Sequence, residues 1–201
     1  MPLLRRRATA QPPDDLLALV DERVLGAVPL AQDDSSWAVA TTHHLLVLSR
    51  GAHAAAGPRE GDAPNADAPG PEPHAERYGW DEVEHGSWDA EERAFTLRWT
   101  RMEHPDLVLS VPAGVRREAG YVECDVEPFA RALRQRVEAA IVHSATTTLP
   151  SGAPASASIR RDARGRLYSI TRPAHCTDQA DAAALRDLER RAADGVGLPT
   201  T

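Results

Sequence analysis

Lysine is absent from this chain: all 23 of its basic residues are arginines. A Schiff-base mechanism and a phosphate-binding loop of the Gly-x-x-x-x-Gly-Lys type both require a lysine amine, so the sequence excludes both. A high-GC coding sequence, which also enriches alanine, aspartate and proline, explains the absence more simply than selection for guanidinium chemistry. Aromatic residues are scarce, at 4% of the chain, and hydrophobic residues make up 42%. This composition predicts one modest core accompanied by polar segments.

Cysteine is scarce as well. Cys124 and Cys176 lie far apart, and neither belongs to a Cys-x-x-Cys or Cys/His cluster. We expect two reduced thiols, as in a cytosolic protein, although a disulfide between them stays open. The net charge of −7 argues against nucleic acid as a partner.

Long hydrophobic runs are also missing. No window approaches the roughly 20 apolar residues that a membrane-spanning helix needs. Arg5, Arg6 and Arg7 are followed by a polar, proline-containing stretch, which is the wrong order for an export signal. The sequence therefore predicts a cytoplasmic protein with no integral membrane segment.

The most informative stretch is 36–48, which contains two apolar and β-branched segments. Thr42 and His43 form a short polar turn between them, as expected for a hairpin. A short helix is predicted to begin near Asp14 or Asp15, and strand character follows over 22–30.

Two segments lack the patterns of regular structure. Residues 1–12 form a polar tail that we expect to be disordered. Residues 51–76 contain five prolines but no aromatic residue, leucine, isoleucine or valine. Such a segment gains too little from burial to offset its ordering entropy, which predicts a disordered insertion at 51–76.

The rest of the chain reads as strands followed by helices. The clearest helix is expected over 126–143, because Phe129, Leu133, Val137 and Ile141 recur every four residues. The other expected elements are strands at 78–87, 93–100 and 107–111, a linker at 146–156, a hairpin of 157–161 and 166–171, and a helix from Asp178 onward.

This order predicts an α+β fold: a curved antiparallel β-sheet or partly open barrel capped by one amphipathic helix. We expect a single domain over 14–193, in which a C-terminal hairpin and helix occupy 156–193. The length of the chain is sufficient for one domain with a real core.

The sequence of residues 37–48, followed by Tyr78-Gly79-Trp80-Asp81-Glu82-Val83, resembles the bacterial pleckstrin-homology-like (PH-like) and GRAM-like proteins found in high-GC bacteria. The resemblance covers roughly 23–143 and implies a PH-like fold. Two features depart from that family. A hairpin and another helix follow the long helix, and the insertion at 51–76 lies where the family has a short loop.

One cluster of side chains suggests a binding site. Five arginines lie on or beside the predicted C-terminal hairpin and are opposed only by Asp162: Arg160, Arg161, Arg164, Arg166 and Arg172. Because guanidinium groups match the geometry of phosphate oxygens, the cluster is a candidate anion site. The alternative, which we favour, is that these arginines pair within the molecule with the acidic residues at 81–92.

No catalytic motif or metal site emerges from the other polar residues. His43 and His44 are adjacent, so on a strand they would point to opposite faces and would not share a metal ion. Ser87, Cys124 and Cys176 each lack the base and orienting acid that a nucleophile needs, although His85 and the distant Asp106 leave open a triad assembled in space. The acidic residues of 81–92 lack the spacing of a calcium loop.

The sequence therefore favours a non-catalytic interaction module that needs no cofactor and binds a protein partner, at a sheet edge or between sheet and helix. The alternative function is binding of an anionic headgroup or phosphate ligand by the arginine hairpin. That alternative leaves a peripheral contact with lipid open.

Overall fold

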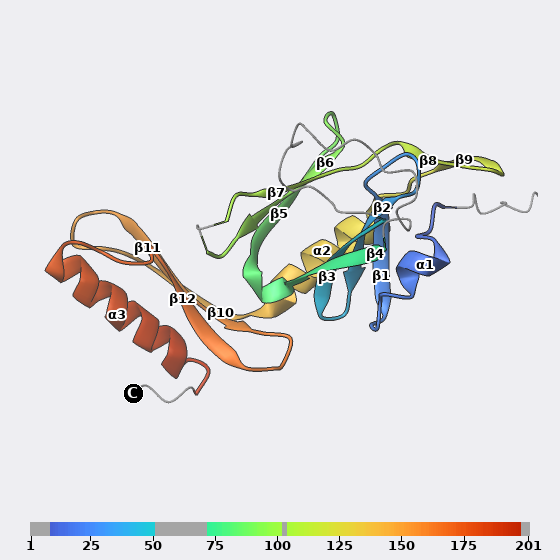
Figure 1. The fold of residues 1–201 in the computed structure, drawn as a ribbon. Helices are drawn as coiled ribbons and strands as arrows, with labels where there is room; N and C mark the ends of the chain where they lie inside the picture. Colours follow the sequence, from blue (N-terminus) through green and yellow to red (C-terminus); the bar gives the residue numbers. More distant parts are fainter. Residues whose placement is uncertain (1–8, 51–71, 102–103, 198–201) are drawn as a thin grey trace, which may run out of the picture. The chain divides into compact units, whose positions relative to one another are not determined.

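The computed structural model describes residues 9–50, 72–101 and 104–197 (Figure 1). Contacts within the chain divide it into two compact units. The first unit comprises Met1–Tyr78, Gly86–Leu97 and Asp106–Leu133, and the second comprises Gly79–His85, Arg98–Pro105 and Arg134–Thr201. The single domain predicted for 14–193 stays a prediction.

The first unit is built around a four-stranded sheet in the order β1-β2-β3-β4. Its strands are β1 (Val24–Pro29), β2 (Ser36–Thr41), β3 (His44–Arg50) and β4 (Pro73–Gly79). The predicted hairpin turn at Thr42 and His43 is confirmed, and β2 pairs antiparallel with β3. The short helix α1 (Asp14–Leu17) adds the buried Leu16 to a core that includes Trp37, Leu46 and Leu48.

The predicted tail and insertion lie mostly outside the described residues. Residues 1–8 and 51–71 are not described. The described end of the insertion differs from the prediction, because β4 begins at Pro73. The end of the tail is also held in place: Ala10 is buried and donates its N–H to the carbonyl of Glu123.

A second sheet has the order β5-β6-β7, formed by β5 (Val83–Asp89), β6 (Ala94–Trp99) and β7 (Leu107–Ser110). The turn of 3-10 helix η1 (Trp80–Glu82) precedes it, so the strand predicted to start at residue 78 starts later. A small hairpin, β8 (Gly114–Arg117) and β9 (Gly120–Glu123), follows and was not predicted. Its residue Gly120 has a φ of 117°, which a glycine adopts without strain.

The long helix α2 spans Glu127–Ala140 and ends three residues before the predicted boundary. Phe129, Leu133 and Val137 are buried, as the four-residue spacing predicts. Ile141 instead begins a strand, because the apolar β-branched pair Ile141-Val142 continues into the threonine-rich stretch. Gly26 of β1 lies so close to α2 that a Cβ there would approach the backbone nitrogen of Phe129 to 2.6 Å.

The second unit contains a three-stranded antiparallel sheet in the order β10-β11-β12, with helix α3 beside it (Figure 1). These elements are β10 (Ile141–Thr148), β11 (Pro154–Arg161), β12 (Leu167–Arg172) and α3 (Gln179–Asp194). The prediction of a linker at 146–156 is therefore wrong, because these residues contain the end of β10, a turn and the start of β11. The hairpin at 157–171 and a helix starting at Asp178 are confirmed, and Asp178 is the N-cap of α3.

Helix α3 covers one face of this sheet. Ala155, Ala157 and Ile159 of β11 are buried against Leu185 and Leu188 of the helix. The described strands are mostly antiparallel and outnumber the helices, which confirms an α+β protein, but they form separate sheets rather than a closed barrel. No helix in the described ranges is long and apolar enough to cross a bilayer.

Candidate functional site

Two of the five hairpin arginines are held inside the second unit. Arg172 donates from Nε to Oε1 of Glu84 at 2.6 Å, and its Nη2 donates to Oε2 of the same carboxylate. Nη2 also reaches the carbonyl oxygens of Trp99 and Thr100, at 3.1 and 3.0 Å. The Nε and Nη2 groups of Arg172 therefore donate hydrogen bonds within the chain, as the internal-pairing interpretation predicts.

Arg160 is buried, with only 4% of its surface exposed. Its Nη1 donates to the carbonyl oxygens of Asp81 and Val83, at 3.1 and 2.8 Å, while its buried Nε has no partner among the described residues. Tyr168 lies beside it and donates to a carboxylate oxygen of Asp81 at 2.7 Å. Burial lowers the pKa of Arg160, and burial together with the bond to Asp81 raises the pKa of Tyr168.

The other three arginines lie at or beside the turn between β11 and β12. Arg161, Arg164 and Arg166 are exposed. Asp162 partly neutralises them: it accepts from the Nε of Arg166 at 2.7 Å and from the backbone N–H groups of Arg164 and Arg166. The structure thus separates the predicted cluster into two side chains committed to internal contacts and three that face solvent.

The other candidate residues from the sequence lie outside the hairpin. Burial raises the pKa of the Cys124 thiol to about 11, which disfavours the reactive thiolate. Ser87 and His85 are exposed on β5. His44 does have an acidic partner, since its Nδ1 contacts Oε1 of Glu22. Across the described part of the chain, no group of three or more potential metal ligands comes together.

A different surface stands out on the sheet of the second unit. Alternation along β10 and β11 places Ala155, Ala157 and Ile159 under α3, so Ser156 and Ser158 face the other way. Ser144, Thr146 and Thr148 of β10 are exposed. Since Thr146 is opposite Ser156, which is opposite Arg172, these side chains share the face that α3 leaves uncovered.

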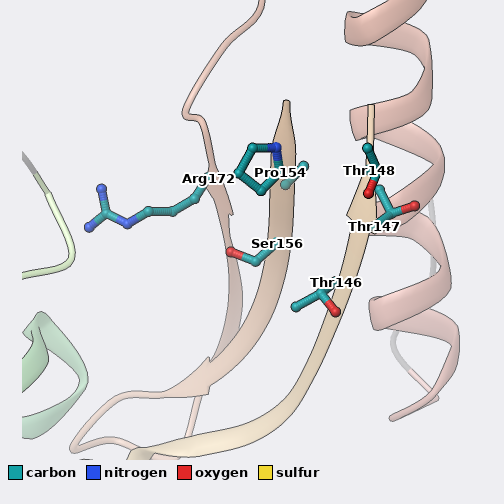
Figure 2. A pocket seen from close by; sticks show the side chains of 7 residues that line it. Thr146, Thr147, Thr148, Pro154, Ser156 and Arg172 are labelled. Carbon is teal, nitrogen blue, oxygen red and sulfur yellow. The ribbon is translucent and has the colours of Figure 1, made fainter. Parts of the chain in front are cut away.

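An open groove of about 530 Å³ lies along this part of the sheet. Thr146, Thr147, Thr148, Pro154 and Ser156 line it together with Ala155 and Arg172. Figure 2 shows the three threonines on one strand, Pro154 and Ser156 on the next, and the guanidinium of Arg172 directed away from the threonines. Four of the seven lining residues carry a hydroxyl group, and Arg172 is the one charged residue among them.

The backbone of β10 is open on its outer side. Within the described ranges, β10 pairs with β11 and with no other strand. The N–H of Leu149 donates to the carbonyl of Ala153 at 2.8 Å, which marks 149 and 153 as a hydrogen-bonded pair. Such pairs alternate along an antiparallel ladder. Residue 147 is therefore hydrogen-bonded to residue 155, and residue 145 to residue 157.

The residues between these pairs are therefore the ones that face outward. Alternation directs the backbone N–H and C=O groups of Ser144, Thr146 and Thr148 to the open edge. Pro154 agrees with this assignment, because it is opposite Thr148 in a pair that needs no N–H from it. We define the outward groups of Ser144, Thr146 and Thr148 as the β10 edge.

Composition alone does not indicate a strand at this edge, because a run of Thr, Pro, Ser, Gly and Ala is typical of a linker. The β-branched Thr146-Thr147-Thr148 was the available signal for a strand. Comparison with known proteins adds no relative: neither a protein-family model, nor a curated protein, nor a solved structure matches the chain.

Proposed function

We propose that this protein is a non-catalytic interaction module whose protein partner adds a strand to the β10 edge. The main supporting observation is an open edge strand, eight residues long, that contains no Arg, Asp, Glu or Pro. Its register shift lies between Ile141 and His143, before the three residues of the β10 edge, so these three are in regular pairing. An unprotected edge of this kind is a template for pairing with another chain, and proteins normally block it with charge, proline or a bulge.

Other sheet edges in the described residues carry such protection. Strand β4 begins with Pro73 and contains Glu76 and Arg77. Strand β5 contains Glu84 and Asp89. These charges and the proline disfavour an added strand at either edge.

The remaining edges in the described residues are short, irregular or charged, including β8 and β9, which have four residues each and carry charged side chains. Strand β1 has a register shift near Gly26 and ends at Pro29. Strand β12 ends at Arg172, which is followed by Pro173. Strand β7 is uncharged and exposes Val108, but it has only four residues. Length and lack of protection together favour β10.

A second candidate function is binding of an anionic headgroup or phosphate ligand at the β11–β12 turn. Its support is the exposure of Arg161, Arg164 and Arg166, whose acidic neighbour on the hairpin is Asp162. Arg160 and Arg172 would contribute less than the sequence suggests, because their donors are engaged elsewhere. An affinity that falls steeply with salt would favour this candidate over strand addition.

Three finer predictions belong with this proposal: a PH-like family relationship, a bacterial source and a cytoplasmic location. The separate sheets and the open β10 edge fit a binding module with or without that relationship. The absence of a chemical activity is also part of the proposal, and a hydrolase screen with His85→Ala and Ser87→Ala variants tests it. Turnover that both substitutions abolish in folded protein would contradict it.

The test of strand addition uses a proline at the open edge. Thr146→Pro removes an outward N–H, so the β10–β11 ladder stays intact while the added strand is blocked. Val108→Pro is the matched control, because Val111 N–H donates to the carbonyl of Arg93 and alternation makes the N–H of Val108 face outward on β7.

We expect the wild-type protein and Val108→Pro to retain a partner from an extract of the source cells. Thr146→Pro should lose that partner. Amide exchange at 144–148 should slow when the purified partner is added. Equal retention by a folded Thr146→Pro variant, with no slowing at 144–148, would overturn the proposal.

A further inference from the structure

The β10 edge is complementary to itself. Its three outward residues, Ser144, Thr146 and Thr148, are all hydroxyl residues, and β10 contains no Asp, Glu or Arg that would oppose a second copy by like-charge repulsion. We infer that the strand added to β10 is the β10 strand of a second copy of this chain. This inference rests on the proposed function, because it identifies the partner at the same edge.

Backbone geometry selects the register of this pairing. Antiparallel strands bond through residues whose N–H and C=O groups face each other. A two-fold axis at Thr146 pairs Thr146 with its own copy and Ser144 with Thr148 of the other copy. Every outward residue of the β10 edge then meets another outward residue. Moving the axis to residue 145 or 147 leaves one outward residue of the edge without such a match.

The side chains are compatible with the same register. On the face away from α3, Thr146 meets Thr146 and Ser144 meets Thr148, and cross-strand hydroxyl pairs of this kind stabilise sheets. On the face toward α3, Ala145 lies opposite Thr147 of the other copy. Within 144–148, neither face therefore brings a large side chain against another or buries a charge.

The helices also fit. The axis is perpendicular to the sheet, so both α3 helices lie on the same face of a continuous six-stranded sheet. Helix α3 packs on Ala155, Ala157 and Ile159 of β11. The two β11 strands would be three strand spacings apart, roughly 14 Å at about 4.8 Å each. That separation accommodates two helices of about 10 Å diameter side by side.

Single-cysteine variants test the register directly. In a hydrogen-bonded antiparallel pair the Cα atoms are about 5.5 Å apart, which is within reach of a disulfide or a short bifunctional thiol reagent. We expect Thr146→Cys to give a covalent dimer. Ser144→Cys and Thr148→Cys should not do so singly, but the double variant should. The wild-type protein, which keeps Cys124 and Cys176, is the control.

Sedimentation of the purified full-length chain tests the dimer itself. We expect the mass to double as concentration rises for the wild type and for Val108→Pro, whereas folded Thr146→Pro stays monomeric. A wild-type monomer at every concentration would overturn the inference. So would a dimer that Thr146→Pro leaves intact or that Thr146→Cys fails to cross-link.

These outcomes separate the inference from the proposed function. A monomeric protein that still loses a cellular partner in the Thr146→Pro variant overturns the second-copy inference and leaves strand addition standing. A monomeric protein whose partner is unaffected by that substitution overturns both.

Discussion

Arg172 of β12 and Glu84 of β5 form a two-point ion pair within the second unit, with Nε and Nη2 of the arginine on the two carboxylate oxygens. Both side chains are about 30% exposed, at 28% and 31%. The same guanidinium serves two backbone carbonyls, so it links β12 to two other segments of the second unit. Its principal role in the fold is therefore structural.

The first prediction concerns this pair. Arg172→Ala should lower the free energy of unfolding by about 1.5–3 kcal/mol, because it removes charge-assisted bonds from the Glu84 carboxylate and from two carbonyls. The matched control is Arg190→Ala, whose pair with Asp187 is more than half exposed and should matter by less than about 0.5 kcal/mol. Urea unfolding measures both, and equal effects would refute the structural role.

Arg160 and Arg161 provide the second prediction, since they are neighbours on β11 with opposite environments. Arg160→Ala should cost about 2–4 kcal/mol, because the carbonyls of Asp81 and Val83 lose their donor and a buried volume is emptied. Arg161→Ala should stay within about 0.5 kcal/mol. Thermal and urea unfolding of the two variants, side by side, decides whether the burial of Arg160 matters energetically.

Local elements were largely predictable because their signals are local. The hairpin turn at Thr42-His43, the Asp178 cap and Gly165, whose φ is 79°, each act within a few residues. The strand β10 was not fully predicted, because the Thr, Pro, Ser, Gly and Ala content of 146–156 indicated a linker despite the β-branched run Thr146-Thr147-Thr148. Strand pairing decides the structure there, and pairing depends on residues elsewhere in the chain.

The environment of the arginines was not predictable from charge alone. Alternation of Ser156, Ser158 and Arg160 along β11 places all three on one face, but nothing local shows what covers that face. The carbonyls that accept from Arg160 belong to residues 79 and 77 positions earlier in the chain. A count of arginines on a hairpin therefore overestimates the positive charge available to a ligand.

The third prediction concerns acid stability. Burial opposes ionisation of Glu22, but bonds from Thr41 and His44 and the backbone N–H of His43 outweigh it and lower its pKa from 4.5 to about 2. A folded-state pKa below the unfolded one adds stability that is present above pH 4.5 and disappears as the pH falls toward 2. With 12% of the side chain exposed, this contribution amounts to about 2–3 kcal/mol at neutral pH.

Glu22→Gln should therefore be less stable than the wild type at about pH 7, and the difference should shrink steadily below pH 4.5. Glu127→Gln is the control, because Glu127 is 72% exposed and its pair with Arg131 is on the surface. Urea unfolding across the pH range measures the difference. A gap between wild type and Glu22→Gln that stays constant down to pH 2 would contradict the assignment.

The fourth prediction compares the two faces of α2. Leu133 is 3% exposed, so Leu133→Ala should cost about 2–5 kcal/mol through lost burial and the cavity left behind. Arg131 is exposed and pairs with Glu127 at 2.6 Å, so Arg131→Ala should cost less than about 0.5 kcal/mol. Equal losses in urea unfolding would mean that the buried face of the helix is assigned wrongly.

The last prediction tests the packing of Leu133 against β5. A Cβ at Gly86 would approach Cδ2 of Leu133 to 2.9 Å, so Gly86→Ala forces that side chain to shift and should be destabilising by about 1–3 kcal/mol. In a Leu133→Ala background the same methyl group enters space that the leucine has vacated. The double variant should therefore be more stable than the sum of the single losses implies, by about 0.5–2 kcal/mol. Strict additivity in a double-mutant cycle would show that Gly86 and Leu133 are not in contact, because residues that share no packing interaction change the stability independently.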